Sequence, residues 1–225
     1  MREKILYGLG VAGILLLARN IFTIANFPPE AAQGAIFKII FFHVPAAWTA
    51  IVGATAALIL SIQFLRTKDF KYDAAAVAVT EVGLAFLTVN LVTGSIWGRV
   101  IWGIWWTWDV RLTSALVCWL LYAGYLMLRH AIEEPTQRAT FAAVFSIFAF
   151  LDVPIVYFSI RWFRTQHPGP VFLSSNGSFP ANWMLVMMLN WLAFLMLGYV
   201  IMAIRLGQEE TQREIDYVRR TAHAL

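Results

Sequence analysis

Six long apolar segments dominate this 225-residue sequence and restrict the folds that it can adopt. The hydrocarbon core of a bilayer is about 30 Å thick and takes about 20 apolar residues in a helix. Segments of that length lie at approximately 5–25, 39–65, 74–96, 112–129, 140–160 and 182–205. Since lipid offers no partners to backbone polar groups, and these runs lack the alternation of barrel strands, each is predicted to be a helix. We therefore expect an all-α membrane protein, a six-transmembrane-helix bundle forming one integral membrane domain over residues 1–225.

The composition also favours a membrane protein over a soluble one. Hydrophobic residues make up 60% of the chain and charged residues 13%, and the mean hydropathy is +0.68. The net charge of +4 does not indicate a nucleic-acid partner, because the basic residues lie between apolar runs and form no basic patch. The opening Met1–Ile24 begins like a signal peptide, but its apolar run is too long and no small-residue cleavage site follows. It is predicted to remain as the first span.

The distribution of basic residues predicts the orientation of the bundle. Eleven of the 17 Lys and Arg residues lie on the side that holds both termini, and six lie on the other side. Basic residues accumulate on the cytoplasmic side of membrane proteins. Both termini are therefore predicted to be cytoplasmic, with the opposite loops facing outward. The tail from Gln208 carries mixed charges at helical spacing, and we expect a solvated helix there.

One outward segment, Trp97–Ser114, reads WGRVIWGIWWTWDVRLTS and holds five of the ten tryptophans. Such a cluster is typical either of an aromatic belt at the membrane interface or of a flat apolar wall for a flat ligand such as a macrocycle. A belt has two rims, whereas eight tryptophans map to the outer end and none to a cytoplasmic segment. The one-sided distribution favours a binding wall.

This segment is expected to form an outer-face, amphipathic, tryptophan-rich loop, or a helix that lies along the membrane surface. Trp102, Trp105, Trp106 and Asp109 are spaced i, i+3, i+4 and i+7, so they would share one helical face. Asp109 is expected to hydrogen-bond an indole N–H or a backbone group and hold this stripe in place. The candidate ligand contacts of the segment are Trp97, Trp102, Trp105, Trp106, Trp108 and Asp109.

The sequence allows more than one role for several charged residues near the outer end and within the spans. Arg99 and Arg111 either neutralise carboxylates on a ligand or contact lipid headgroups. Asp152, followed by Pro154, either kinks the fifth span or pairs with a nearby arginine. Glu81, near the cytoplasmic end of the third span, is expected to have a structural role.

The four histidines divide into two pairs by predicted side. His130 and His223 map to the cytoplasmic side, where solvated imidazoles are expected. His43, in FFHVPAAW, and His167, in RWFRTQHPGP, map to the same side as the tryptophans. A lone interfacial histidine is usually only a hydrogen-bonded polar residue. Two of them beside an indole wall suit haem, because its iron accepts one imidazole on each face.

The stretch WGRVIWGIWWTWDVRLTS resembles the WWD signature of the haem-handling proteins of cytochrome c maturation. Within that group, the six spans, the motif HVPAAW at the second span and TQHPG before the sixth are similar to the haem exporter protein C (CcmC) family. The resemblance covers nearly the whole chain. It departs at Pro168, where we expect a polar residue after the histidine.

The resemblance implies a multi-pass protein of the bacterial inner membrane that is not an enzyme and serves cytochrome c-type biogenesis. It implies that haem b is bound non-covalently and transiently at the periplasmic face. By position, the axial ligands would be His43 and His167, and the haem would contact Trp97 through Asp109 in the WWD loop, residues 97–112. The expected partners are the haem chaperone CcmE, which receives the haem, the ABC transporter subunits CcmA and CcmB, the small membrane protein CcmD, and membrane lipid.

Two functions other than haem delivery are alternatives for this sequence. A b-type cytochrome that transfers electrons would carry histidine ligands inside the bundle, and no predicted span has a buried histidine pair. A permease for haem or another solute would show broken helices and polar groups near the midplane. The mid-span polar residues are few, mainly Asn90, Thr93 and Asn190, so transport stays an open alternative.

Overall fold

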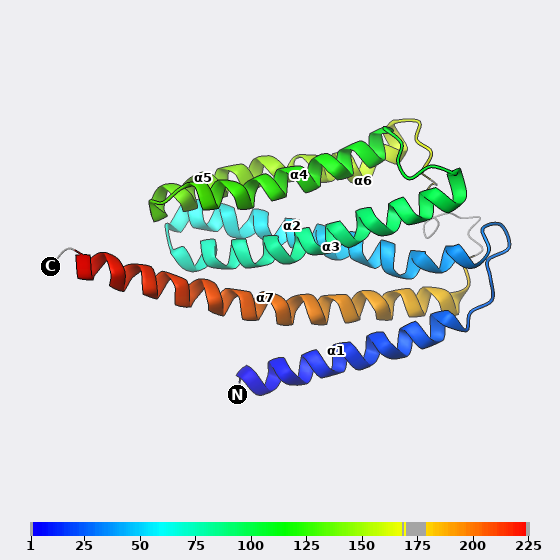
Figure 1. Ribbon diagram of the computed structural model, residues 1–225, viewed down its shortest axis with the longest axis horizontal. Coiled ribbons are helices and arrows are strands. Elements are labelled where there is room, and N and C mark those ends of the chain that lie inside the picture. The colour runs from blue at the N-terminus through cyan, green and yellow to red at the C-terminus, as the bar shows by residue number, and fades with distance from the viewer. Residues whose placement is uncertain (1, 168, 170–178, 224–225) are drawn as a thin grey trace.

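The computed structural model describes residues 2–167, 169 and 179–223, and helices are its main elements (Figure 1). Their bounds are α1 Arg2–Ala25, the short 3-10 helix η1 Ala35–Ile39, α2 Ile40–Thr67, α3 Phe70–Trp102, α4 Val110–Ala131, α5 Pro135–Phe150, α6 Asp152–Trp162 and α7 Ala181–His223. Within the described part of the chain, six helical segments are long and apolar enough to cross a membrane, with α5 and α6 counted as one. The predicted six-helix bundle is confirmed.

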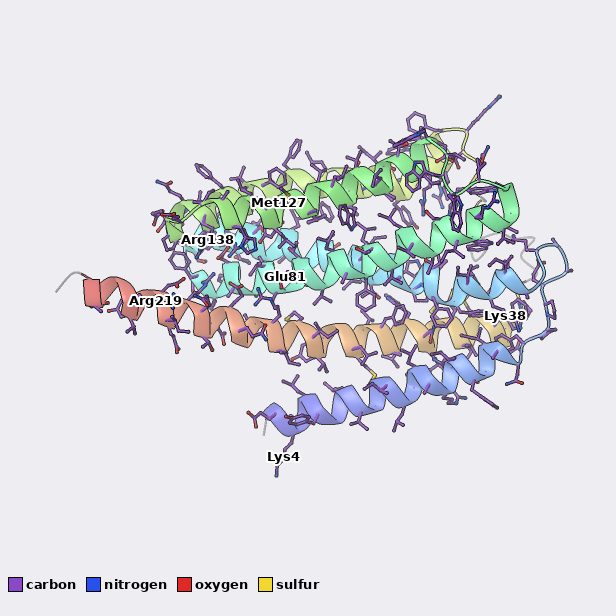
Figure 2. The ribbon with its side chains drawn as sticks, in the orientation of Figure 1. Lys4, Lys38, Glu81, Met127, Arg138 and Arg219 are labelled. Carbon is purple, nitrogen blue, oxygen red and sulfur yellow. The ribbon has the colours of Figure 1, made fainter. Side chains whose placement is uncertain are left out.

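The helices form a bundle in which α2 and α3 lie at the centre (Figure 1). Helices α4, α5 and α6 pack on one side of this central pair, α7 packs on the other, and α1 packs mainly against α7. Both termini lie at one end, which we call the terminal end, and the opposite end is called the loop end. Figure 2 shows Arg138 and Arg219 toward the terminal end and Lys38 at the loop end.

Helix boundaries follow from local chemistry at the connections. Asp69, Asp109 and Glu134 are the N-cap residues of α3, α4 and α5, and each carboxylate accepts backbone N–H bonds from the first turn of its helix. Lys68 and Gly103 adopt positive φ values of 58° and 76° at the ends of α2 and α3. A left-handed residue ends a helix, so these positions fix where the turns begin.

The fifth span is broken at Leu151, between α5 and α6. Pro154 has no N–H to donate to the carbonyl of Phe150, which removes one helical hydrogen bond at this point. This interruption agrees with the kink, one of the two alternatives expected at Asp152. The alternative ion pair is not formed, because Asp152 has none among the described residues and its buried Oδ2 has no hydrogen-bond partner there.

A second proline, Pro45, lies inside α2 and leaves the carbonyl of Phe41 without its helical donor. The side chain of Asn190 on α7 donates to that carbonyl at 2.6 Å. Asn20 on α1 donates in turn to Asn190 at 3.2 Å, and both amides are fully buried. This relay ties three helices together and satisfies the backbone group that the proline frees, two residues from His43.

The terminal end is held by ion pairs that join α3 to α4 and α7. Asp73 binds Arg129 through both oxygens, at 2.5 and 3.1 Å, and also pairs with Arg213 of the helical tail. Glu81 pairs with Arg205, as its expected structural role requires. The predicted tail helix is present as a continuation of α7, and Arg213 anchors it to the bundle.

Candidate functional site

A cavity of about 670 Å³ lies between α2, α3, α4 and α6 and extends from the loop end into the bundle. Its walls are mostly apolar, and it brings together side chains from segments that are far apart in sequence. The sequence-predicted candidates that line it are His43, His167, Trp97, Trp102, Trp106 and Arg111. The four other candidates, Arg99, Trp105, Trp108 and Asp109, do not line it.

His43 enters the cavity from the first turn of α2 and rests against α3. Its ring meets Trp97 edge to face, with 5.8 Å between centroids. A Cβ atom at Gly94 would lie 3.0 Å from Cε1 of His43, so glycine leaves the room that the ring needs. Nδ1 of His43 lies 3.1 Å from the hydroxyl of Thr93, and Asn90 donates to the His43 carbonyl at 3.1 Å.

His167 reaches the same cavity from the segment that follows α6. Its backbone N–H donates to Thr165 Oγ1 at 3.1 Å, and that hydroxyl donates back to the backbone carbonyl of His167 at 3.3 Å. The preceding residue, Gln166, donates its N–H to Oδ2 of Asp109 at 3.0 Å. Pro168, the residue at which the chain departs from the expected pattern, lies outside the described residues.

Asp109 connects the tryptophan segment to the His167 segment. Its Oδ1 accepts from the N–H of Leu112 at 2.8 Å and caps α4, while its Oδ2 accepts from Gln166. The expectation that Asp109 bonds a backbone group agrees with this geometry. Asp109 thus acts from behind the cavity wall, by holding two loops together.

The tryptophan segment does not form the surface helix that its spacing predicts. Of the two forms expected, the loop is the one present, because α3 continues to Trp102, Gly103 ends it, and residues 103–109 form an irregular loop. Trp102 folds back on α3, where a Cβ at Gly98 would lie 3.1 Å from its ring. The loop instead separates its tryptophans: Trp106 lines the cavity, whereas Trp105 is 59% exposed and lies outside it.

The remaining tryptophans have distinct surroundings. Trp97 donates its indole N–H to Gln33 at 2.7 Å, which fixes its ring beside the cavity. Nε1 of Trp106 is buried and has no hydrogen-bond partner among the described residues. Trp108 is 77% exposed and contacts Trp106 edge to face at 5.9 Å between centroids. Trp97, Trp102 and Trp106 are therefore the indoles of this segment that line the cavity, and Trp48 of α2, which was not among the candidates, lines it as well.

The two candidate arginines differ in position. Arg111 lines the cavity and donates to the carbonyl of Val156 at 2.6 Å, which holds α4 against α6. Arg99 is exposed and donates to the Gly103 carbonyl at the end of α3. Arg161 lines the cavity as well, although its sequence context gave no sign of this. A ligand with carboxylates would find Arg111 and Arg161 at the cavity wall.

The two imidazoles do not form a site for a bare metal ion. In the ranges that the structure describes, no cluster of three or more His, Cys, Asp or Glu side chains could hold one. Structural and catalytic zinc sites use three or four protein ligands. Two histidines on an apolar cavity suit a metal that brings its own equatorial ligands.

Comparison with known proteins points to one family. The family model described as "Heme exporter protein C" matches residues 1–221. Proteins named Heme exporter protein C from Bradyrhizobium diazoefficiens and Paracoccus denitrificans are 33% and 35% identical, over 96% and 84% of this chain and 82% and 79% of their own lengths. The Escherichia coli protein of that name is 34% identical over 72% of this chain and 66% of its own length.

Proposed function

The chain belongs to the heme exporter protein C family, and from that membership and the loop-end cavity we propose that it handles haem in cytochrome c biogenesis. It binds haem b non-covalently in this cavity and releases it to the haem chaperone CcmE. The observation that carries the proposal is the meeting of His43 and His167, from two distant segments, at one apolar cavity.

The residues at the cavity fit a haem in four respects. Its volume, about 670 Å³, lies within the range of about 300–1,000 Å³ typical of cofactor pockets. Gly94 and Gly98, which lack Cβ atoms, leave room for the rings of His43 and Trp102 at the cavity wall. The buried N–H of Trp106 lacks a partner within the described chain. Imidazole is also a common axial ligand of haem iron.

Haem would supply the iron and its four equatorial nitrogens. The chain would supply the remaining iron ligands and the residues that contact the macrocycle and its propionates. His43 and His167 would be the axial ligands, and Trp97, Trp102 and Trp106 would pack against the macrocycle. Arg111 would neutralise a propionate with the donors that do not bind Val156. These bonds are non-covalent, as release to another protein requires.

The proposed orientation turns the loop end of the bundle, with His43 and His167, toward the periplasm. Both termini lie at one end, and the larger share of basic residues belongs to that end. The positive-inside rule then makes the terminal end cytoplasmic and the loop end periplasmic, in a bacterial inner membrane. The ABC transporter subunits CcmA and CcmB and the small protein CcmD are proposed as partners on the basis of family membership.

The test of delivery is transfer between purified proteins. Haem-loaded protein in lipid nanodiscs is mixed with purified CcmE or, as a passive acceptor, with apomyoglobin. Haem should move to CcmE faster than to apomyoglobin at equal concentrations. Haem that stays on the protein, or moves equally fast to both acceptors, would contradict delivery, and full retention would favour the electron-transfer alternative.

One observation supports transport as a second candidate function. The cavity lining continues down α3 from Trp102 to Thr80, about 33 Å at 1.5 Å per residue, and reaches Tyr122 on α4. A haem-binding reporter trapped inside proteoliposomes tests this function. Haem added outside should reach the reporter faster than in empty liposomes only if the bundle itself conducts haem.

Two neighbouring tryptophans test the ligand wall. Trp106→Leu should weaken haem binding about two- to twelvefold, because aromatic contacts contribute about 0.5–1.5 kcal/mol beyond area burial. Trp105→Leu is the matched control, since Trp105 is exposed and outside the cavity. Haem affinity is measured by absorbance titration in detergent. Equal affinities in the two variants would contradict the assignment of Trp106 to the wall.

A further inference from the structure

The imidazole of His43 is seated on three residues of α3, Asn90, Thr93 and Gly94, spaced i, i+3 and i+4 on one helical face. This seat lies behind the ring, against the helix. It determines which ring nitrogen carries the proton, and therefore which nitrogen is left with a lone pair for a metal.

The Thr93 hydroxyl is an acceptor toward His43. Its Oγ1 lies 2.6 Å from the carbonyl of Val89 and 3.1 Å from that of Asn90, and carbonyl oxygens only accept hydrogen bonds. A hydroxyl has a single proton, which these carbonyls take. At 3.1 Å from Nδ1 of His43, Oγ1 can then only accept, so Nδ1 must be the protonated nitrogen.

The amide of Asn90 also contacts the ring, but it does not select a tautomer. Its Nδ2 donates to the His43 carbonyl at 3.1 Å, which fixes the amide nitrogen toward the ring. That nitrogen lies 3.3 Å from both Nδ1 and Nε2, so its hydrogens approach the two ring nitrogens equally. The assignment of the tautomer therefore rests on Thr93.

We propose that Thr93 is a positioning residue that holds His43 as the Nδ1–H tautomer and presents Nε2 to the iron of haem. This inference deepens the proposed function and rests on it. A ligand imidazole that donates its other N–H to a neighbour has a fixed ring orientation and is more basic, and loss of the partner typically weakens metal binding 10–100-fold. Gly94 completes the seat by leaving room for the ring.

The direct test uses the protein without haem, so that it does not depend on haem binding. Histidine is labelled with 15N, and the ring nitrogen shifts are measured at about pH 9, where imidazole is neutral. The His43 signals, assigned by their loss in His43→Gln, should show a protonated Nδ1 and an unprotonated Nε2. In Thr93→Val the population should move toward the Nε2–H form, and in Thr93→Ser it should return to the wild-type tautomer.

Thr88→Val is the matched control, because the Thr88 hydroxyl on the same helix bonds Leu84 and Trp119 and makes no bond to His43. It should leave the His43 shifts unchanged. A protonated Nε2 in the wild type, or an unchanged tautomer in Thr93→Val, overturns the proposal about Thr93. A haem titration of the same wild-type sample separates that outcome from failure of haem binding itself.

A second readout distinguishes positioning from general loss of structure. With haem bound, Thr93→Val should weaken affinity about 10–100-fold and raise the midpoint potential of the iron, since a less basic imidazole stabilises ferric iron less. Thr93→Ser should restore both quantities. A lower affinity with an unchanged potential in Thr93→Val would indicate only a structural role and would contradict the proposal.

Discussion

His43→Ala is expected to weaken haem binding by more than about 100-fold. This exceeds the 10–100-fold loss that removal of an outer partner of a metal ligand produces, because the axial ligand itself is removed. His167→Ala should have an effect of similar size, since both imidazoles line the cavity. Dissociation constants are obtained by titrating each purified variant with haem and following its absorbance.

The matched control is His130→Ala. His130 is exposed near the end of α4, at the opposite end of the bundle from His43, and does not line the cavity, so its loss should leave haem affinity unchanged. If His43→Ala and His130→Ala bind haem equally well, His43 is not a ligand. Helix content from circular dichroism confirms that each variant is folded.

The largest effect on stability is expected at the buried ion pair of Asp73. Asp73→Asn should lower the free energy of unfolding by about 3–5 kcal/mol, because it leaves Arg129 buried without its counter-charge. The side chains of Asp73 and Arg129 are only 4% and 7% exposed. Unfolding is followed by circular dichroism as the protein, in mixed micelles, is titrated with a denaturing detergent.

Glu81→Gln is the control for this prediction, because it removes a carboxylate charge from the same helix. Glu81 and Arg205 are 27% and 32% exposed, so the loss should be at most about 1 kcal/mol. Equal losses in the two variants would show that burial does not set the strength of these pairs. Both variants should keep the wild-type haem affinity, since neither carboxylate lines the cavity.

The spans could be predicted because their length and hydropathy follow from the thickness of the bilayer. The exact ends of the helices could not be predicted in this way, because polar capping residues beyond the apolar runs determine them. The third span was expected over 74–96, whereas α3 runs from Phe70 to Trp102. Asp69 starts this helix and Gly103 ends it, and neither residue contributes to an apolar run.

The predicted tryptophan stripe failed because periodicity alone does not detect a helix end. Trp102, Trp105, Trp106 and Asp109 have helical spacing, yet Gly103 adopts φ +76° and Asp109 is the N-cap of the next helix. Glycine after an apolar run and an aspartate before the next one are the usual stop and start signals. These signals outweigh the spacing at this point.

Sidedness predicted that His43 and His167 share one end of the bundle, but no spacing argument could place them on one cavity. Their seats depend on contacts between elements distant in sequence, such as Thr93 with His43 and Asp109 with Gln166. In the sequence, Asn90 and Thr93 stand out only as polar residues within a span, which is a feature relevant to transport. Their register with Gly94 on one helical face was the signal for a seat.

The spin state of the bound haem iron tests the central claim most directly. Electron paramagnetic resonance of the ferric, haem-loaded protein should show a low-spin signal, as two imidazole ligands give. His43→Ala and His167→Ala, measured separately with haem in excess of protein and unbound haem removed, should each lose that signal and gain a high-spin one. A wild-type low-spin signal that persists in both variants would contradict bis-histidine binding at the loop-end cavity.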